Sequence, residues 1–144
     1  EGKFIFYTNH SSKKGRDLAR NPKVHLMFFW PKMERQIRIK GVATFMEESE
    51  SRIYFNKRPF ESRVAAAVSP QSSIVPNREY LEEKFFSILK AKDDNAEIEM
   101  PKDWGGVKVR PTEFEFWQGR ISRLHDRIRF KQNGGNWKIE RLAP

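Results

Sequence analysis

The sequence predicts a mainly β fold, an antiparallel barrel or sandwich with helices inserted between some of its strands. Two long segments, 35–45 and 106–117, alternate apolar and polar residues, which is typical of half-buried strands. Asn133-Gly134-Gly135 separates two shorter strand-like segments and is a strong hairpin signal. Helical segments follow only some of the strands, which favours an antiparallel sheet over a repeating β-α-β arrangement.

The first third of the chain predicts strands at 3–9 and 24–30 with a short helix at 12–20 between them. The run VHLMFFW within the second strand is almost entirely apolar, which predicts a strand buried on both faces. In the next strand, 35–45, we expect Gly41 to mark a bulge. The residues expected to face inward in that strand are Ile37, Ile39, Val42 and Phe45.

The middle of the chain predicts helices. One covers 47–57, and Pro59 opens the next, so Arg58 should lie at the junction between them. Turn residues dominate 69–76, and Asn77 then caps a helix at 78–90. The apolar face of that helix should hold Leu81, Phe85, Ile88 and Leu89.

The last third predicts three strands. Residues 91–103 read as a polar, acidic surface connection that leads into the strand at 106–117. Pro111 in that strand indicates an edge position or a bulge. The final two strands, 127–131 and 136–142, flank the hairpin turn. With no internal repeat, the 144 residues suit a single domain, 1–144.

Composition restricts the class of protein. The absence of cysteine excludes a disulfide framework, a thiolate metal site and a cysteine nucleophile, and no metal site is expected. No apolar run approaches the length of a membrane span, and the first residues, EGKFIFYTNH, do not resemble a signal peptide. We therefore expect a soluble cytoplasmic protein with no membrane partner.

The net charge of +9 is uneven along the chain. Residues 1–40 carry ten Lys and Arg against three acids, or +7; residues 41–103 carry nine against twelve, or −3; residues 104–144 carry nine against four, or +5. This balance could indicate nucleic acid or small phosphorylated ligands. Because the cations are interleaved with apolar residues and form no basic tail, small phosphorylated ligands are favoured over nucleic acid.

Basic residues gather near the end of the chain, in the stretch EFWQGRISRLHDR. If it is extended, Arg123, His125 and Arg127 project to one side, about 6.6 Å apart at about 3.3 Å per residue. Such a group repels itself unless it faces an anion or an electron-rich ligand. A solvated strand whose cations pair with carboxylates such as Asp126 is the alternative.

Further candidates for phosphate contacts lie earlier in the chain. Lys13 and Lys14 fall in the first turn of a helix, where a bound phosphate would relieve the repulsion between these cations and the helix dipole; two solvated lysines are the alternative. Tyr54, Arg58 and Ser62 converge on the junction of two helices and could clamp a phosphate. Gln36, at a strand start, offers both a donor and an acceptor to a ring edge, although such a residue is often simply exposed.

Sequence motifs along nearly the whole chain resemble those of the pyridoxamine 5′-phosphate oxidase family. They are YTN at Tyr7, SKKG at Ser12, RQIRIKG at Arg35, YFNKRPFES at Tyr54, VSPQSS at Val68, WGG at Trp104, FWQGRISRLHDR at Phe116 and the terminal WKIERLAP. The resemblance implies an FMN-binding split β-barrel, antiparallel and Greek-key-like, that works as an obligate homodimer with flavin between the subunits. Residues 104–144 would correspond to the family's C-terminal dimerisation region.

The resemblance also implies roles for individual residues. The positions matching FMN-binding residues are Tyr7, Thr8, Lys13, Lys14, Gln36, Gln71, Ser72, Trp117 and Arg127. The positions matching residues that bind the phosphorylated substrate are Tyr54, Arg58, Ser62, Arg123 and His125. Arg123 and His125 are the catalytic candidates, Arg123 lying over the substrate ring and His125 assisting proton movement or only binding the ligand.

The implied reaction is oxidation of pyridoxamine or pyridoxine 5′-phosphate to pyridoxal 5′-phosphate, with FMN as cofactor and O2 as the acceptor that becomes H2O2. Two departures from the family pattern stand out. Lys13 replaces the more common Arg and loses its bidentate fork. The chain also begins after an upstream strand that carries FMN and substrate contacts, so we expect the 144 residues to be N-terminally incomplete; alone they would bind flavin weakly and leave a barrel edge unpaired.

Two other functions are carried as alternatives. A non-catalytic flavin or pyridoxal-phosphate carrier on the same fold would be yellow but would consume no oxygen. A nucleic-acid-binding module would be colourless, and its affinity for DNA or RNA would fall steeply with salt.

Overall fold

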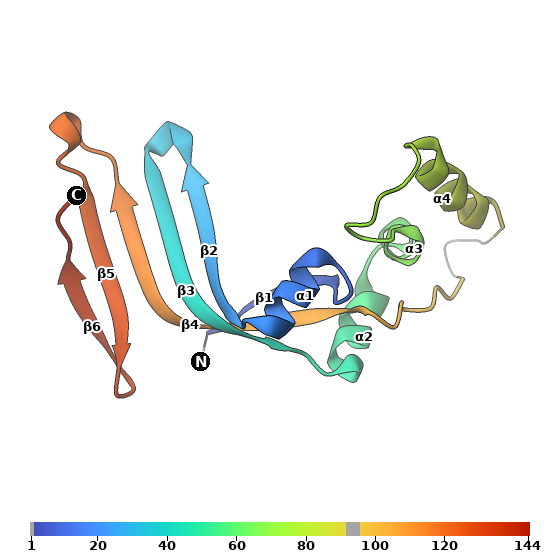
Figure 1. Ribbon diagram of the computed structural model, residues 1–144, viewed down its shortest axis with the longest axis horizontal. Helices are drawn as coiled ribbons and strands as arrows, with labels where there is room; N and C mark the ends of the chain where they lie inside the picture. The colour runs from blue at the N-terminus through green and yellow to red at the C-terminus, as the bar shows by residue number, and fades with distance from the viewer. Residues whose placement is uncertain (1, 92–95) are drawn as a thin grey trace. The chain divides into compact units, whose positions relative to one another are not determined.

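The computed structural model describes residues 2–91 and 96–144 (Figure 1). Its elements are, in order, β1 (Phe4–Asn9), α1 (Lys13–Arg20), β2 (Lys23–Trp30), η1 (Pro31–Met33), β3 (Arg35–Phe45), α2 (Glu48–Lys57), α3 (Phe60–Val68), α4 (Glu79–Ala91), β4 (Trp104–Gln118), η2 (Ile121–Arg123), β5 (Asp126–Asn133) and β6 (Asn136–Arg141). The predicted helices and strands are confirmed, with ends that differ by at most two residues.

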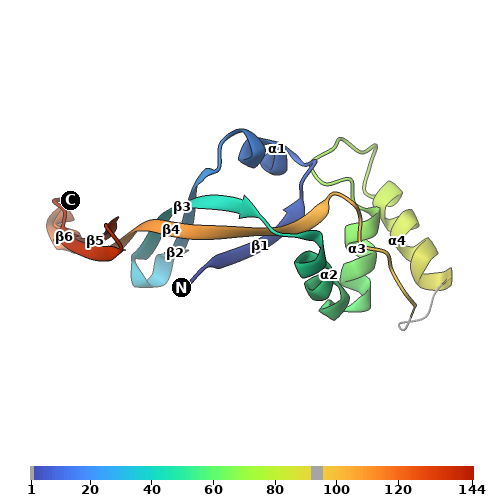
Figure 2. The same ribbon diagram turned by 90° about the horizontal axis from the view of Figure 1, so that it is seen from below.

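The strands form one six-stranded sheet in the order β2-β3-β4-β5-β6, with β1 paired to β4. The pairs β2–β3, β4–β5 and β5–β6 are antiparallel, which confirms the predicted fold class. The predicted hairpin joins β5 to β6 (Figure 1) through Gly134 and Gly135, whose φ angles of 56° and 90° suit a tight turn. Figure 2 shows β1 alongside its partner β4. Pro111 of β4 lies before the ladder with β5, which starts at Glu113, so its missing N–H costs that ladder nothing.

The bulge predicted at Gly41 is wrong. Pairing of β2 with β3 is unbroken from Lys23 opposite Val42 to Trp30 opposite Arg35. Burial accordingly alternates without a shift: Ile39, Gly41 and Ala43 are buried, whereas Val42 is only half-buried and Phe45 is exposed. Glycine is needed at position 41 for a close approach, because a Cβ there would lie 2.7 Å from the carbonyl oxygen of Arg110 and from a methyl group of Val109.

The prediction that β2 is buried on both faces is wrong within this chain. Met27, Phe28 and Phe29 are 65%, 43% and 52% exposed, and they lie on both faces of the strand. The physical reason is position, since β2 is the end strand of the β2-to-β6 order. The apolar run therefore forms an exposed surface rather than part of the core.

Contacts divide the chain into two compact units. The first unit comprises residues 1–4, 21–44 and 108–144 and holds β2, β5, β6 and most of β3 and β4. The second comprises residues 5–20 and 45–107 and holds α1, α2, α3 and α4. Within the described residues, no helix is long and apolar enough to cross a membrane.

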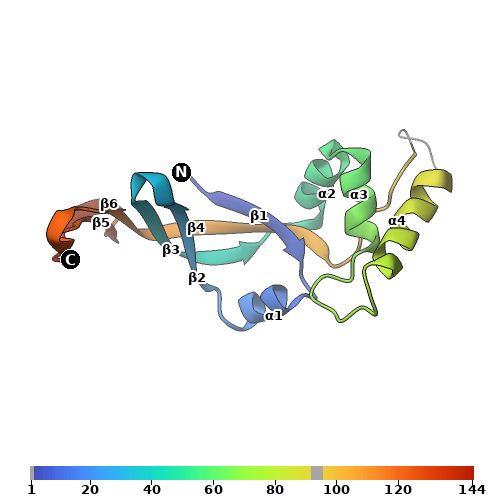
Figure 3. The same cartoon turned by 90° about the horizontal axis from the view of Figure 1, so that it is seen from above.

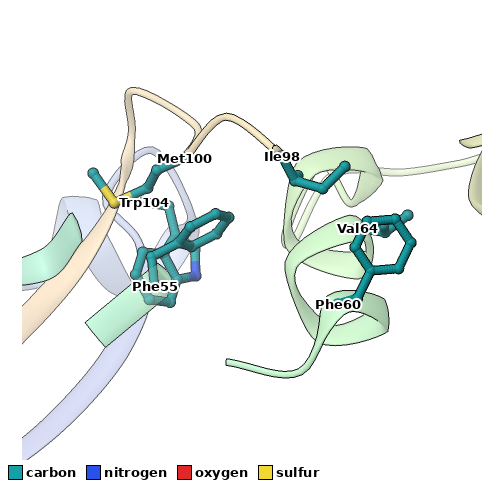
Figure 4. Packing of buried hydrophobic residues seen from close by; sticks show 6 residues of the cluster. All are labelled: Phe55, Phe60, Val64, Ile98, Met100 and Trp104. Carbon is teal, nitrogen blue, oxygen red and sulfur yellow. The ribbon is translucent and has the colours of Figure 1, made fainter. Parts of the chain in front are cut away.

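The core of the second unit is a cluster of Phe55, Phe60, Val64, Ile98, Met100 and Trp104 (Figure 4). Helices α3 and α4 lie side by side there (Figure 3), and three of the four predicted apolar residues of α4, Phe85, Ile88 and Leu89, pack against the cluster. The start of α4 is capped as predicted, because the Asn77 carboxamide oxygen accepts a 2.9 Å hydrogen bond from the backbone N–H of Tyr80.

The expectation that 91–103 is merely a surface connection is corrected for its described part, since residues 92–95 lie outside the described residues. Ile98 and Met100 are only 6% and 4% exposed. They alternate with the exposed Glu97 and Glu99, so the segment is extended with one apolar face on the core. The segment is rich in acidic residues, so its alternation of apolar and charged side chains is easily missed in the sequence.

Candidate functional site

The second unit contains a cavity of about 590 Å³ that includes two predicted substrate-binding residues. It is lined by Ile5, Phe6, Tyr7, Tyr54, Arg58 and Trp104. Arg58 ends α2 in an extended conformation (φ −72°, ψ 150°), as predicted for a residue before proline. Tyr54 lies one helical turn earlier, and Ser62 falls in the first turn of α3. The local sequence therefore brings Tyr54 and Arg58 to one cavity, whereas Ser62 is not among its lining residues.

Aromatic rings hold the Arg58 side chain. The rings of Tyr7 and Tyr54 are stacked with centroids 3.9 Å apart, and Tyr7 stacks on Trp104 at 5.1 Å. The guanidinium of Arg58 lies 5.1 Å from the Trp104 ring centroid, within the range of a cation–π interaction. Its Nη1 atom is buried and has no hydrogen-bond partner among the described residues. A buried, unsatisfied cationic donor beside a cavity is suited to binding an anion.

A second cavity of about 300 Å³ brings together several predicted cofactor-binding residues. Tyr7, Thr8, Arg58 and Gln71 are among its lining residues. The Gln71 side-chain oxygen accepts hydrogen bonds from the Thr8 hydroxyl, at 3.1 Å, and from the backbone N–H of Asn9, at 2.6 Å. Ser72 follows in a left-handed conformation, with φ of 68°. The structure thus joins the YTN and PQSS motifs, which are more than 60 residues apart in sequence.

The first turn of α1 presents both predicted lysines to solvent. The Ser12 hydroxyl accepts a 3.2 Å hydrogen bond from the backbone N–H of Gly15 and so caps the helix. Lys13 pairs with Asp17 at 2.9 Å, and Lys14 lies over the ring of Phe6. The Lys13 pair is exposed and contributes little to stability, so both ammonium groups remain accessible to a ligand.

The first unit has its own cavity of about 420 Å³, which contains Gln36 and Trp117. Its other lining residues are Trp30, Arg35, Ile37, Phe116, Gln118, Arg120, Asp126 and Ile128. The His125 ring lies beside the wall of this cavity, with its centroid 4.9 Å from that of Trp117. Its Nδ1 atom accepts a 3.1 Å hydrogen bond from the backbone N–H of Arg120. Three predicted site residues, Gln36, Trp117 and His125, are therefore close together.

The expectation that Arg123, His125 and Arg127 project from one extended strand is wrong. Residues 121–123 form the turn η2, and Ser122 and Arg123 have left-handed φ angles of 58° and 61°. β5 begins only at Asp126. Because of this left-handed turn, side chains do not alternate between two faces from residue 123 to residue 127. The exposed Arg123 is therefore not aligned with Arg127. Alternating polarity alone could not reveal two consecutive residues with positive φ.

The Arg127 side chain forms hydrogen bonds with two other residues of the same chain. Its Nε and Nη2 atoms donate to the two carboxylate oxygens of Glu115 at 2.9 and 3.1 Å, and Nη1 donates to the carbonyl oxygen of Ala143 at 2.8 Å. Glu115 is only 7% exposed. The Arg127 hydrogen bonds hold the pKa of Glu115 below its usual value, and the same pair raises the pKa of Arg127.

Sequence reasoning missed Trp104 and Gln118, which line these cavities, and Glu115, which pairs with Arg127. In the sequence, Trp104 stands out only as part of the WGG motif, Glu115 reads as one polar residue of an alternating strand, and Gln118 gives no signal of its own. A carboxylate on the inward face of a strand would have been a usable signal for Glu115, because a buried charge needs a partner. Among the described residues, no group of three or more His, Asp or Glu side chains could hold a metal ion.

Comparison with known proteins finds two family models in this chain. The model described as "Pyridoxamine 5'-phosphate oxidase" matches residues 1–91, and the model described as "Pyridoxine 5'-phosphate oxidase C-terminal dimerisation region" matches residues 104–144. A pyridoxine/pyridoxamine 5'-phosphate oxidase from Polynucleobacter asymbioticus is 51% identical over 142 residues. That match covers 98% of this chain and 66% of the relative, so the chain spans slightly less than two thirds of the relative's length.

Two solved structures are similar in fold. PhzG from Burkholderia lata 383, in complex with tetrahydrophenazine-1-carboxylic acid, superposes with a TM-score of 0.87 and 31% identity, over 97% of this chain and 68% of PhzG. A pyridoxamine 5'-phosphate oxidase-related, FMN binding protein from Nostoc punctiforme superposes with a TM-score of 0.74 over 99% of this chain and 73% of that one. At 14% identity, the second likeness concerns the fold alone.

Proposed function

Because the chain belongs to the pyridoxamine 5′-phosphate oxidase family, we propose that the whole protein is an FMN-dependent oxidase that makes pyridoxal 5′-phosphate. Its substrates are pyridoxamine 5′-phosphate and pyridoxine 5′-phosphate. The amine, O2 and water give the aldehyde, ammonia and H2O2, whereas the alcohol and O2 give the aldehyde and H2O2.

The observation that carries this proposal is the buried, unsatisfied Nη1 of Arg58 beside the cavity that it lines with Tyr54. A phosphate would accept hydrogen bonds from this guanidinium and from the Tyr54 hydroxyl, and Ser62 at the start of α3 would add a third donor. Binding the phosphate far from the reacting carbon lets that binding energy orient the substrate ring.

The residues present also fit FMN. The exposed lysines of α1 suit a flavin phosphate, the Thr8–Gln71 pair offers hydroxyl and amide groups, and Gln36 beside Trp117 offers an amide next to an aromatic face. We assign FMN to Tyr7, Thr8, Lys13, Lys14, Gln36, Gln71, Ser72, Trp117 and Arg127. Bound FMN would supply the redox chemistry, taking up a hydride from the substrate and returning the electrons to O2.

Arg123 and His125 are the proposed catalytic residues. The Nδ1 atom of His125 accepts a hydrogen bond from the Arg120 backbone, so a neutral His125 carries its proton on Nε2. That tautomer presents a donor to the substrate, while the ring packs on Trp117. Arg123, exposed in a left-handed turn, would place a permanent positive charge near the ring that is oxidised.

We further infer a homodimer. β2 exposes Met27, Phe28 and Phe29, an apolar surface that a second copy of the chain would cover. The match of residues 104–144 to a dimerisation region supports the same inference. A cytoplasmic location remains a prediction.

The decisive experiment uses the purified full-length protein. The proposal expects a flavin absorption spectrum, and H2O2 release with pyridoxamine 5′-phosphate that is far slower with unphosphorylated pyridoxamine. A yellow protein that releases no H2O2 with either phosphorylated substrate would support the carrier instead. A colourless protein whose binding to DNA weakens steeply with salt would support the nucleic-acid module, and either result would refute the oxidase.

A further inference from the structure

We propose that Gln118 is a positioning residue that ties the turn before Gln36 to the end of β4 and thereby sets the spacing of Gln36 and Trp117. The inference rests on the proposed function, because it takes Gln36 and Trp117 as flavin-binding residues. Gln118 itself need not touch the flavin.

All the hydrogen-bonding groups of the Gln118 side chain are used. Its carbonyl oxygen accepts from Nε of Arg35 at 2.7 Å. Its amide nitrogen donates to the backbone carbonyls of Met33, Glu34 and Gly119, at 3.1, 3.4 and 3.2 Å. One carboxamide therefore connects the last residue of β4 with Met33 and Glu34 of the turn and with Arg35 at the start of β3.

The turn that Gln118 contacts has a strained backbone. Glu34 has left-handed angles, φ 48° and ψ 44°, a conformation that costs a non-glycine residue about 1 kcal/mol. Its carbonyl accepts hydrogen bonds from the Gln118 amide at 3.4 Å and from the backbone N–H of Gly119 at 2.8 Å. A Cβ on Gly119 would lie 2.8 Å from Cβ of Glu34, so only glycine allows the turn to approach the strand end this closely.

The Gln118 hydrogen bonds connect the two strand ends that contain the flavin-binding candidates Gln36 and Trp117. Gln36 follows Arg35 at the start of β3, and Trp117 precedes Gln118 at the end of β4. Both side chains line the cavity of about 420 Å³. To form hydrogen bonds with a ring edge, the Gln36 side chain must be positioned within about 0.5 Å. Loss of the Gln118 hydrogen bonds should therefore weaken flavin binding.

The experiment compares full-length wild type with Gln118→Ala, Gln118→Glu and the matched control Gln132→Ala, an exposed glutamine on β5. Gln118→Glu keeps the acceptor for Arg35 but loses both N–H donors to the turn. We expect both Gln118 variants to bind FMN about tenfold more weakly, the equivalent of roughly one hydrogen bond, with a shifted flavin absorption band. Gln132→Ala should match wild type.

Hydrogen exchange of the apoprotein supplies a readout that needs no flavin. The amides of Glu34 and Gly119 should exchange faster in the Gln118 variants than in Gln132→Ala, while exchange in β6 stays unchanged. Exchange at these two amides equal to wild type, or flavin affinity and spectrum equal to wild type in both variants, would overturn the inference. A wild-type protein that binds no FMN would refute the proposed function, and the exchange result alone would then decide whether Gln118 holds the turn.

Discussion

Glu115 and Arg127 form a two-point ion pair diagonally across β4 and β5, since the direct partners in the ladder are Glu115 with Arg129 and Trp117 with Arg127. The carboxylate is buried, and Arg38 and Lys40 add weaker favourable charge. The pair fixes Arg127, a proposed flavin ligand, before any ligand binds. Because three of its nitrogens are bound within the chain, Arg127 is oriented by the fold rather than by flavin.

Replacing Glu115 by Gln should therefore destabilise the protein by about 2 kcal/mol at pH 7, the range for hydrogen bonds to a charged group. The folded-state pKa of Glu115 is lowered, so its contribution is full above the unfolded value of about 4.5 and is lost as pH falls through the folded pKa. Urea unfolding of wild type and Glu115→Gln should give curves that converge in acid. A constant difference down to about pH 3 would contradict the ion pair's role.

Arg58 offers a prediction about substrate recognition. Arg58→Lys keeps the charge but loses the planar fork and the stacking on Trp104, so KM for pyridoxamine 5′-phosphate should rise about 10- to 100-fold, the equivalent of roughly one hydrogen bond to a charged group. The rate with unphosphorylated pyridoxamine should change little. Arg52→Lys, on the exposed side of the same helix, is the matched control. Equal losses with both substrates would show that Arg58 does not bind the phosphate.

The elements and the meeting of Tyr54 and Arg58 at a helix junction could be predicted from the sequence because they depend on local rules. Proline placed Arg58 at a helix junction, Asn77 marked a cap, and the glycine pair marked a hairpin. Predictions failed where a residue's environment depends on segments that are distant in the sequence. β2 is exposed because it is the end strand of the β2-to-β6 order, and Gly41 faces Arg110 of β4 rather than forming a bulge. The prediction of an extended strand through Ser122 and Arg123 failed for a local reason, because neither residue type indicates a positive φ.

Gly41 gives a stability prediction independent of any ligand. An alanine Cβ would lie 2.7 Å from the carbonyl oxygen of Arg110, and backbone there cannot move away without disturbing β4. Gly41→Ala should lower the free energy of unfolding by about 1–3 kcal/mol, the usual cost of overpacking. Gly2→Ala is the control, because nothing lies within 4 Å of its added methyl group. Gly41→Ala as stable as Gly2→Ala would mean that the two strands separate freely.

His10 predicts a pH dependence of stability near neutrality. Its ring packs against Phe45 with centroids 4.5 Å apart, and its Nε2 atom is buried without a hydrogen-bond partner among the described residues. Burial lowers the pKa of His10 below its ordinary value, although the charge of Asp103 and a backbone hydrogen bond with Gly105 partly oppose this shift. The unfolded chain therefore binds a proton at a higher pH than the folded protein does.

The lower pKa of His10 in the folded protein sets the direction in which stability changes with pH. Above the unfolded pKa of about 6.5, His10 is neutral in both states and carries no penalty; as pH falls below it, protonation favours the unfolded chain. Relative to His10→Gln, wild type should lose stability in urea titrations between about pH 7.5 and pH 5. Parallel pH profiles for wild type and His10→Gln would mean that His10 is protonated as readily in the folded protein as in the unfolded chain.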